Sequence, residues 1–120
     1  MNAQLALFFE SRPEALDLYL ALEEFLLALL PEATVRVQKT QISFDGQSGF
    51  GCVSLPRRKK DSGLVLSLGL GRPLEGTRVL TAVPIRPGRW TNHIRVTSAE
   101  ELDDQLSVWL AEAWAFAHRK

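Results

Sequence analysis

The 120-residue sequence contains a single cysteine, Cys52, and only two histidines. Because one thiol cannot form an internal disulfide, we expect the protein in a reducing compartment, the cytoplasm. Two distant histidines make a poor metal site, and no Cys/His metal spacing, P-loop or His-Glu-x-x-His motif occurs. The sequence therefore predicts neither a metal nor another cofactor.

A targeting segment, a membrane span and an excess of charge are also missing. No Lys or Arg precedes Arg12, and no small-residue cleavage site follows an apolar run, so we expect no signal peptide. The most apolar stretch, residues 16–30, contains Asp17, Glu23 and Glu24, whereas a membrane span needs about 20 mostly uncharged residues. With 14 basic and 14 acidic side chains, the chain is not a polycation of the histone kind.

What the sequence does contain is typical of one globular domain, which we assign to residues 1–120, with 46 % hydrophobic residues. A first helix is predicted from the capping box Ser11-Arg12-Pro13-Glu14 to Pro31. A second follows the capping box Ser98-Ala99-Glu100-Glu101 and has apolar residues at every third or fourth position. Because the first helix is apolar on more than one side, residues 5–9 or a partner subunit must cover it.

Between the helices, the hydrophobic pattern changes to the period of two that is typical of strands. In residues 64–70, four leucines share one face, and Ser67 and Gly69 share the other. Short connections with turn signals such as Pro87-Gly88 favour antiparallel neighbours. The predicted fold is therefore α+β, with two layers: an antiparallel sheet of about five strands, flanked by an N-terminal and a C-terminal helix.

One change of parity interrupts the strand pattern. Val35 and Val37 share a face, but Ile42 and Phe44 require the opposite alternation. A shift by one residue moves every following side chain to the other face of a strand, so residues 39–41 must contain a bulge, a bend or a turn. Bulges gather near functional sites, whereas a plain corner between two strands has no such meaning.

Charge is distributed unevenly along the chain. Residues 1–35 hold one basic and six acidic side chains, and residues 96–120 hold two basic and five acidic ones. Residues 36–95 hold eleven basic and three acidic side chains. Acidic helices therefore flank a basic sheet, and such a separation is typical of a binding face for anions.

The candidate ligand-binding residues lie in three basic segments of the predicted sheet. Cationic side chains pair with phosphates, and an aromatic ring stacks on a base, in nucleic-acid and nucleotide recognition. The candidates are Lys39, Thr40, Arg57, Arg58, Lys59, Arg89, Trp90 and His93. Gly69 and Gly71 lie on the less apolar face of their strand, where missing side chains let a ligand approach the backbone.

Each candidate also has a purely structural interpretation. The hairpin with Arg57-Arg58-Lys59-Lys60 is typical of a solvated loop that guards against edge pairing. Trp90 can cap the core, His93 can be merely exposed, and Cys52 is expected to be buried and inert. Ser43 or Ser67 can form a nucleophile–base pair with His93, but the spacing alone does not show it.

Several segments together resemble an uncharacterised bacterial family, one of the domains of unknown function. The resemblance rests on Val35-Arg36-Val37-Gln38-Lys39-Thr40-Gln41-Ile42-Ser43-Phe44, Pro56-Arg57-Arg58-Lys59-Lys60, Leu68-Gly69-Leu70-Gly71 and Pro87-Gly88-Arg89-Trp90-Thr91-Asn92-His93. More remotely, the chain is similar to the YdhG-like and MmcQ/YjbR-like domains. The resemblance implies an antiparallel sheet with a helix from each end of the chain, and some YjbR-like relatives are labelled DNA-binding. It assigns no role to any residue.

Three hypotheses about function follow. The first is a cytoplasmic, non-enzymatic binding module whose basic sheet face recognises nucleic acid or a phosphorylated metabolite. The second is a homodimer, or an adaptor for an acidic partner, that uses the apolar first helix. The third is an enzyme that acts on a phosphorylated small molecule with His93 as acid or base.

Overall fold

The computed structural model describes residues 2–119, and the middle of the chain forms one antiparallel sheet. Its six strands are β1 (Thr34–Val37), β2 (Ile42–Asp45), β3 (Gly49–Ser54), β4 (Leu64–Leu70), β5 (Val79–Arg86) and β6 (Arg89–Val96), in the spatial order β1-β2-β3-β4-β6-β5. The helices are α1 (Ala3–Phe8), α2 (Leu16–Leu29) and α3 (Asp104–Ala117), and two 3₁₀ turns are η1 (Pro13–Ala15) and η2 (Ala99–Glu101). None of these helices combines the length and the apolar character that a membrane span requires.

The predicted α+β class is confirmed, with six strands instead of about five. The additional strand arises where the parity of the pattern changes. The Gln38 amide donates to the Gln41 carbonyl at 2.9 Å, which closes a turn between β1 and β2. The break predicted at residues 39–41 is therefore a corner between two short strands.

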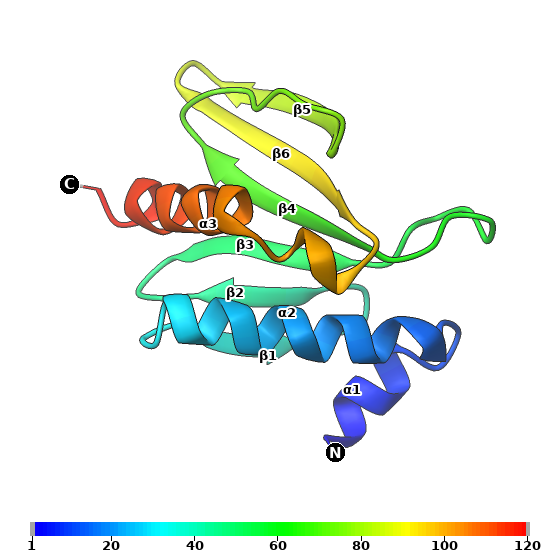
Figure 1. Cartoon of the computed structure of the whole chain (residues 1–120). Helices are drawn as coiled ribbons and strands as arrows, with labels where there is room; N and C mark the ends of the chain where they lie inside the picture. The colour runs from blue at the N-terminus through cyan, green and yellow to red at the C-terminus, as the bar shows by residue number, and fades with distance from the viewer. Residues whose placement is uncertain (1, 120) are drawn as a thin grey trace.

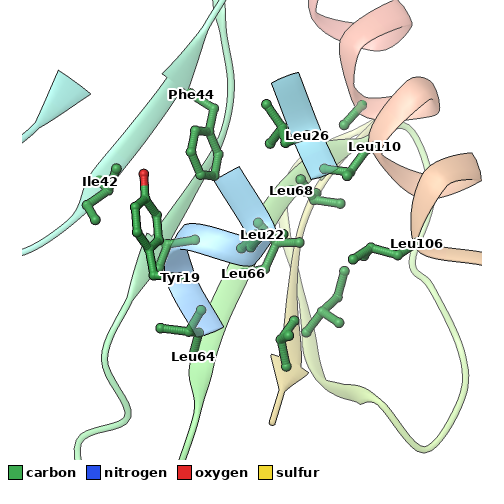
Figure 2. Packing of buried hydrophobic residues seen from close by; sticks show 14 of the residues in the cluster. Tyr19, Leu22, Leu26, Ile42, Phe44, Leu64, Leu66, Leu68, Leu106 and Leu110 are labelled. Carbon is green, nitrogen blue, oxygen red and sulfur yellow. The ribbon is translucent and has the colours of Figure 1, made fainter. Parts of the chain in front are cut away.

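Helices α2 and α3 cover only one face of the sheet (Figure 1). The four leucines of β4 point to this face and have no exposed surface. Figure 2 shows Leu68 of β4 between Leu22 of α2 and Leu110 of α3, and Leu66 of β4 beside Leu22. The alternating pattern of β4 thus places its leucines in the core and Val65, Ser67 and Gly69 on the opposite face, which we call the open face.

Helix α1 supplies the cover that the apolar first helix needs. Phe9, directly after α1, is buried, and its ring centroid lies 5.4 Å from that of Tyr19 in α2. The interpretation in which residues 5–9 provide the cover is therefore confirmed. Leu20 and Leu29, exposed by 39 % and 37 %, are the most exposed large apolar side chains of α2.

The helix starts differ from the predicted ones. The Ser11–Glu14 capping box is wrong: η1 precedes α2, its N-cap is Arg12, and no side chain caps it. At the second site, Glu101 Oε1 does accept from the Ser98 amide at 3.1 Å, but this box caps η2. Helix α3 begins later, where Asp103 accepts from the Leu106 amide. In both places the sequence signal precedes a 3₁₀ turn that delays the α-helix.

Candidate functional site

A row of polar side chains crosses the open face of the sheet. Ser43, Cys52, Ser67 and His93 are successive cross-strand partners on β2, β3, β4 and β6. Paired residues of antiparallel strands share a face, so the four side chains lie next to one another. Arg89 and Arg95 have the same parity as His93 along β6 and lie on the same face.

Hydrogen bonds fix the orientation of this row. Ser67 Oγ lies 2.7 Å from His93 Nδ1, and Ser43 Oγ donates to Gln38 Oε1 at 2.6 Å. Burial raises the pKa of the Cys52 thiol, against a smaller lowering by a hydrogen bond with Ser67. The Cys52 thiol is therefore protonated at neutral pH and is a poor nucleophile. The contact between Ser67 and His93, in contrast, has the spacing of a nucleophile and its base.

The long β3–β4 connection, residues 55–63, extends beyond the sheet (Figure 1), and we call it the basic hairpin. Arg12 holds the backbone of the hairpin by hydrogen bonds. Its guanidinium donates to the Pro56 carbonyl at 3.1 Å, to the Arg58 carbonyl at 2.6 Å, and also to the Asp61 carbonyl. A single side chain thus satisfies three carbonyls that no strand pairs. The backbone that carries Arg57-Arg58-Lys59-Lys60 is therefore anchored to the helical layer.

Arg95 joins the basic hairpin at one end of the open face, which we call the hairpin end. A hollow of about 190 Å³ lies between them and is lined by Arg57, Arg58, Leu80 and Arg95, among others. A second hollow of about 160 Å³ is lined by Lys60 and again by Arg95. The antiparallel register puts Val96, next to Arg95, opposite Leu64 at the exit of the hairpin, so the segments remain side by side.

Ion pairs neutralise some of the eleven cations of residues 36–95. The pairs are Arg36–Asp45 (2.7 Å), Arg58–Asp61 (3.1 Å), Arg72–Glu112 (2.9 Å), and Arg78 with both Asp103 (3.0 Å) and Glu101 (3.9 Å). The other seven have no ion-pair partner within residues 2–119: Lys39, Arg57, Lys59, Lys60, Arg86, Arg89 and Arg95. No group of three His, Cys, Asp or Glu side chains in this part of the chain is placed to hold a metal ion.

Comparison with known families gives one match. A model of a domain of unknown function, DUF5655, matches residues 6–117. The chain belongs to the DUF5655 family. No curated protein and no solved structure matches it. The resemblance to an uncharacterised domain family is thereby confirmed, whereas the remoter similarity to YdhG-like and YjbR-like domains stays a prediction.

The DUF5655 fold brings most of the predicted site residues to the hairpin end. Lys39 and Thr40 lie in the β1–β2 turn, at the same end of the sheet as the basic hairpin, because Ile42 pairs with Val53 near the end of β3. The three hairpin residues of the prediction, Arg57, Arg58 and Lys59, are all exposed. His93 lies in the middle of the open face, and Arg89 lies toward the opposite end.

Trp90 is separated from the other candidates. It pairs with Leu70, whose side chain is in the core, so it lies on the face that bears α3. Its half-buried ring therefore faces away from Arg89 and His93, as strand alternation requires.

Arg95 and Arg12 take part in this candidate site but were not among the predicted residues. Arg95 has the same parity as Arg89 and His93, and this alternation was the signal that could have included it. Arg12 is the one basic residue among the first 35 positions, but its contact with the hairpin spans 44 positions or more and has no local signal.

Proposed function

We propose that the DUF5655 domain binds nucleic acid through the phosphate backbone, along the open face of its sheet. The observation that carries the proposal is the set of cations without ion-pair partners at both ends of this face. Arg89 and Arg95 are six residues apart on β6, which corresponds to about 20 Å along a strand. A phosphorylated metabolite is too short to contact both ends at once, whereas a nucleic-acid strand is long enough to contact both.

Contacts with phosphates, not with bases, are expected to dominate binding. The described strand residues of the open face carry hydroxyl, thiol, imidazole and guanidinium groups but no Phe, Tyr or Trp ring for a base to stack on. Phe116 of α3 reaches only the end of this face, where the Arg89 guanidinium already lies over its ring. Backbone contacts position a protein but carry no sequence information. We therefore expect binding that tolerates sequence and depends strongly on salt.

The test is a titration of labelled duplex and single-stranded oligonucleotides by fluorescence anisotropy at several salt concentrations. Each duplex phosphate neutralised adds about 0.9 to the slope of log affinity against log salt. The Arg57→Gln/Lys59→Gln variant removes two unpaired cations and should reduce that slope by about 1.8.

The matched control is Ala28→Glu/Ala111→Glu, which lowers the net charge by the same amount on exposed positions of α2 and α3. It should leave the slope nearly unchanged because these helices lie on the other face of the sheet. Absence of binding at low salt, or an equal effect of both variants, contradicts the proposal.

One contact favours a second candidate, a phosphoesterase. His93 Nδ1 is placed to take the Ser67 proton while Ser67 Oγ attacks phosphorus, after which the leaving alcohol takes that proton and water releases the phosphate. The test is hydrolysis of p-nitrophenyl phosphate by the wild type and by Ser67→Ala and His93→Gln. Turnover that both variants retain would show that the pair has only a structural role.

A further inference from the structure

Strands β3 and β4 part at the end of the open face that is opposite the basic hairpin. Their ladder runs from the Ser54–Val65 pair to the Gly51–Leu68 pair, and both strands continue beyond it, to Gly49 and Leu70. A hollow of about 150 Å³ lies where they separate, and we call it the glycine hollow. Its lining includes Gly49, Gly51, Gly69, Arg89, Thr91 and Phe116.

Gly69 adds open space to this hollow, not a free backbone donor. The Arg95 amide donates to the Arg78 carbonyl, so the odd-numbered residues of β6 direct their backbone groups to β5, and the even-numbered ones direct theirs to β4. Leu68 pairs with the even-numbered Asn92, so Gly69 directs its backbone to β3, where the Gly51–Leu68 pair puts its amide opposite the Phe50 carbonyl. The missing side chain of Gly69 therefore leaves room on the open face, and the donors of the hollow must be side chains.

The Arg89 guanidinium lies beside Gly69, in the space that a side chain at this position would fill. The Nη2 atom of Arg89 lies 3.2 Å from the point that a Cβ of residue 69 would occupy. Any side chain at position 69 would therefore press against the guanidinium, whereas glycine does not. The guanidinium also lies over the Phe116 ring, 5.8 Å from its centroid. It has no ion-pair partner within residues 2–119. Such a side chain is pre-organised for bidentate binding of an oxyanion.

We propose that the glycine hollow binds a terminal phosphomonoester group of a nucleic-acid strand. The Arg89 guanidinium and the Thr91 hydroxyl are its donors, and Gly69 leaves the space for the phosphate. Phe116 and Ala117 of α3 form a wall of the hollow, so a strand that runs along the open face from the basic hairpin ends there. A phosphomonoester carries about −1.5 to −2 charges at pH 7, more than an internal phosphodiester. This inference rests on the proposed function and adds to it that the domain prefers a nucleic-acid strand that ends in a phosphate.

The test compares oligonucleotides of one sequence with a 5′-phosphate, a 3′-phosphate or neither. We expect a phosphate at one of the two ends to raise affinity about tenfold or more, because hydrogen bonds to a charged group are the strong ones. Arg89→Met keeps the contact with Phe116 but removes the charge, and it should reduce the gain to less than about twofold. Gly69→Ala keeps every charge and should reduce the gain as well.

Arg86→Met is the matched control, because Arg86 is exposed, pairs with Arg89 across the β5–β6 turn and has no ion-pair partner in the described chain. It should lower affinity for all three oligonucleotides alike and preserve the gain. Binding without any gain from a terminal phosphate, or a gain that Arg89→Met retains, overturns this inference only. Absence of oligonucleotide binding overturns the proposed function, and this inference with it.

A further experiment tests whether the hollow prefers the phosphate of a nucleic-acid end over that of a mononucleotide or of free phosphate. A nucleoside monophosphate and inorganic phosphate are titrated while the Gly69 amide and the Arg89 Nε–H are followed by NMR. The proposal expects both signals to shift weakly, with much lower affinity than for the phosphorylated oligonucleotide. Equal affinity for the mononucleotide would identify a metabolite pocket and overturn the choice of a nucleic-acid end.

Discussion

Asn92 has no exposed surface, although it lies in the middle of a strand. Its side chain connects β6 to the β4–β5 connection: Oδ1 accepts from the Leu74 amide at 2.7 Å, and Nδ2 donates to the Arg72 carbonyl at 3.1 Å. Asparagine is disfavoured in strands, so its presence there indicates a specific task. By holding the connection, Asn92 also fixes where β5 begins beside β6.

Replacement of Asn92 by alanine should destabilise the protein by about 2–4 kcal/mol, because a buried donor and a buried acceptor each lose their partner. Chemical denaturation measures the change. Thr91→Ala on the same strand is the control, and since Thr91 is partly exposed on the open face, it should cost less than about 1 kcal/mol. Equal losses in both variants would show that the two hydrogen bonds of Asn92 contribute little.

At the scale of elements, Arg12 anchors the backbone of the basic hairpin through three hydrogen bonds. Ordering a flexible side chain on binding costs about 0.5–1.5 kcal/mol of binding free energy. A loop that is already ordered before binding avoids part of this cost. Arg12 lies between α1 and η1, outside the open face. It is therefore a positioning residue, whose effect on ligand binding passes through the backbone of the hairpin.

Arg12→Met should weaken oligonucleotide binding by about three- to tenfold and speed amide exchange in residues 56–61. Arg72→Met is the control, since it removes the same charge from a side chain that is paired with Glu112 in α3. It should leave amide exchange in the hairpin unchanged. The role assigned to Arg12 is contradicted if its variant binds as tightly as the control, or if exchange in the hairpin does not change.

Local patterns predicted the strands and helices well, because alternation and a 3.6-residue period act within a few positions. The parity change at residues 39–41 even predicted the corner between β1 and β2. The same alternation separates Trp90 from His93, although the two had been grouped by their closeness in sequence. The anchoring by Arg12 and the glycine hollow depend on contacts between distant segments, which no local pattern contains.

At the scale of the whole molecule, ion pairs connect α3 and its N-terminal segment to the sheet side of the domain. Arg72 forms two hydrogen bonds of 2.9 Å with Glu112, and these bonds lower the pKa of that carboxyl. Arg78, whose side chain is 13 % exposed, binds Asp103, and the Leu106 amide together with Arg78 lowers the pKa of Asp103. The acidic helices and the basic sheet are therefore joined by charge as well as by the core.

The sign of these shifts predicts a loss of stability in acid. Both carboxyls have folded-state pKa values below their ordinary values of 4.5 for Glu112 and 3.8 for Asp103, so the unfolded chain takes up protons first as the pH falls. Their contribution is present above about pH 5 and is lost as the pH falls through the lowered pKa values. Denaturation between about pH 6 and pH 3 should therefore show a decline that Arg72→Met/Arg78→Met makes shallower, whereas Arg86→Met, at an unpaired position, does not. Parallel declines in all three proteins would place the acid sensitivity outside the contacts of α3 with the sheet.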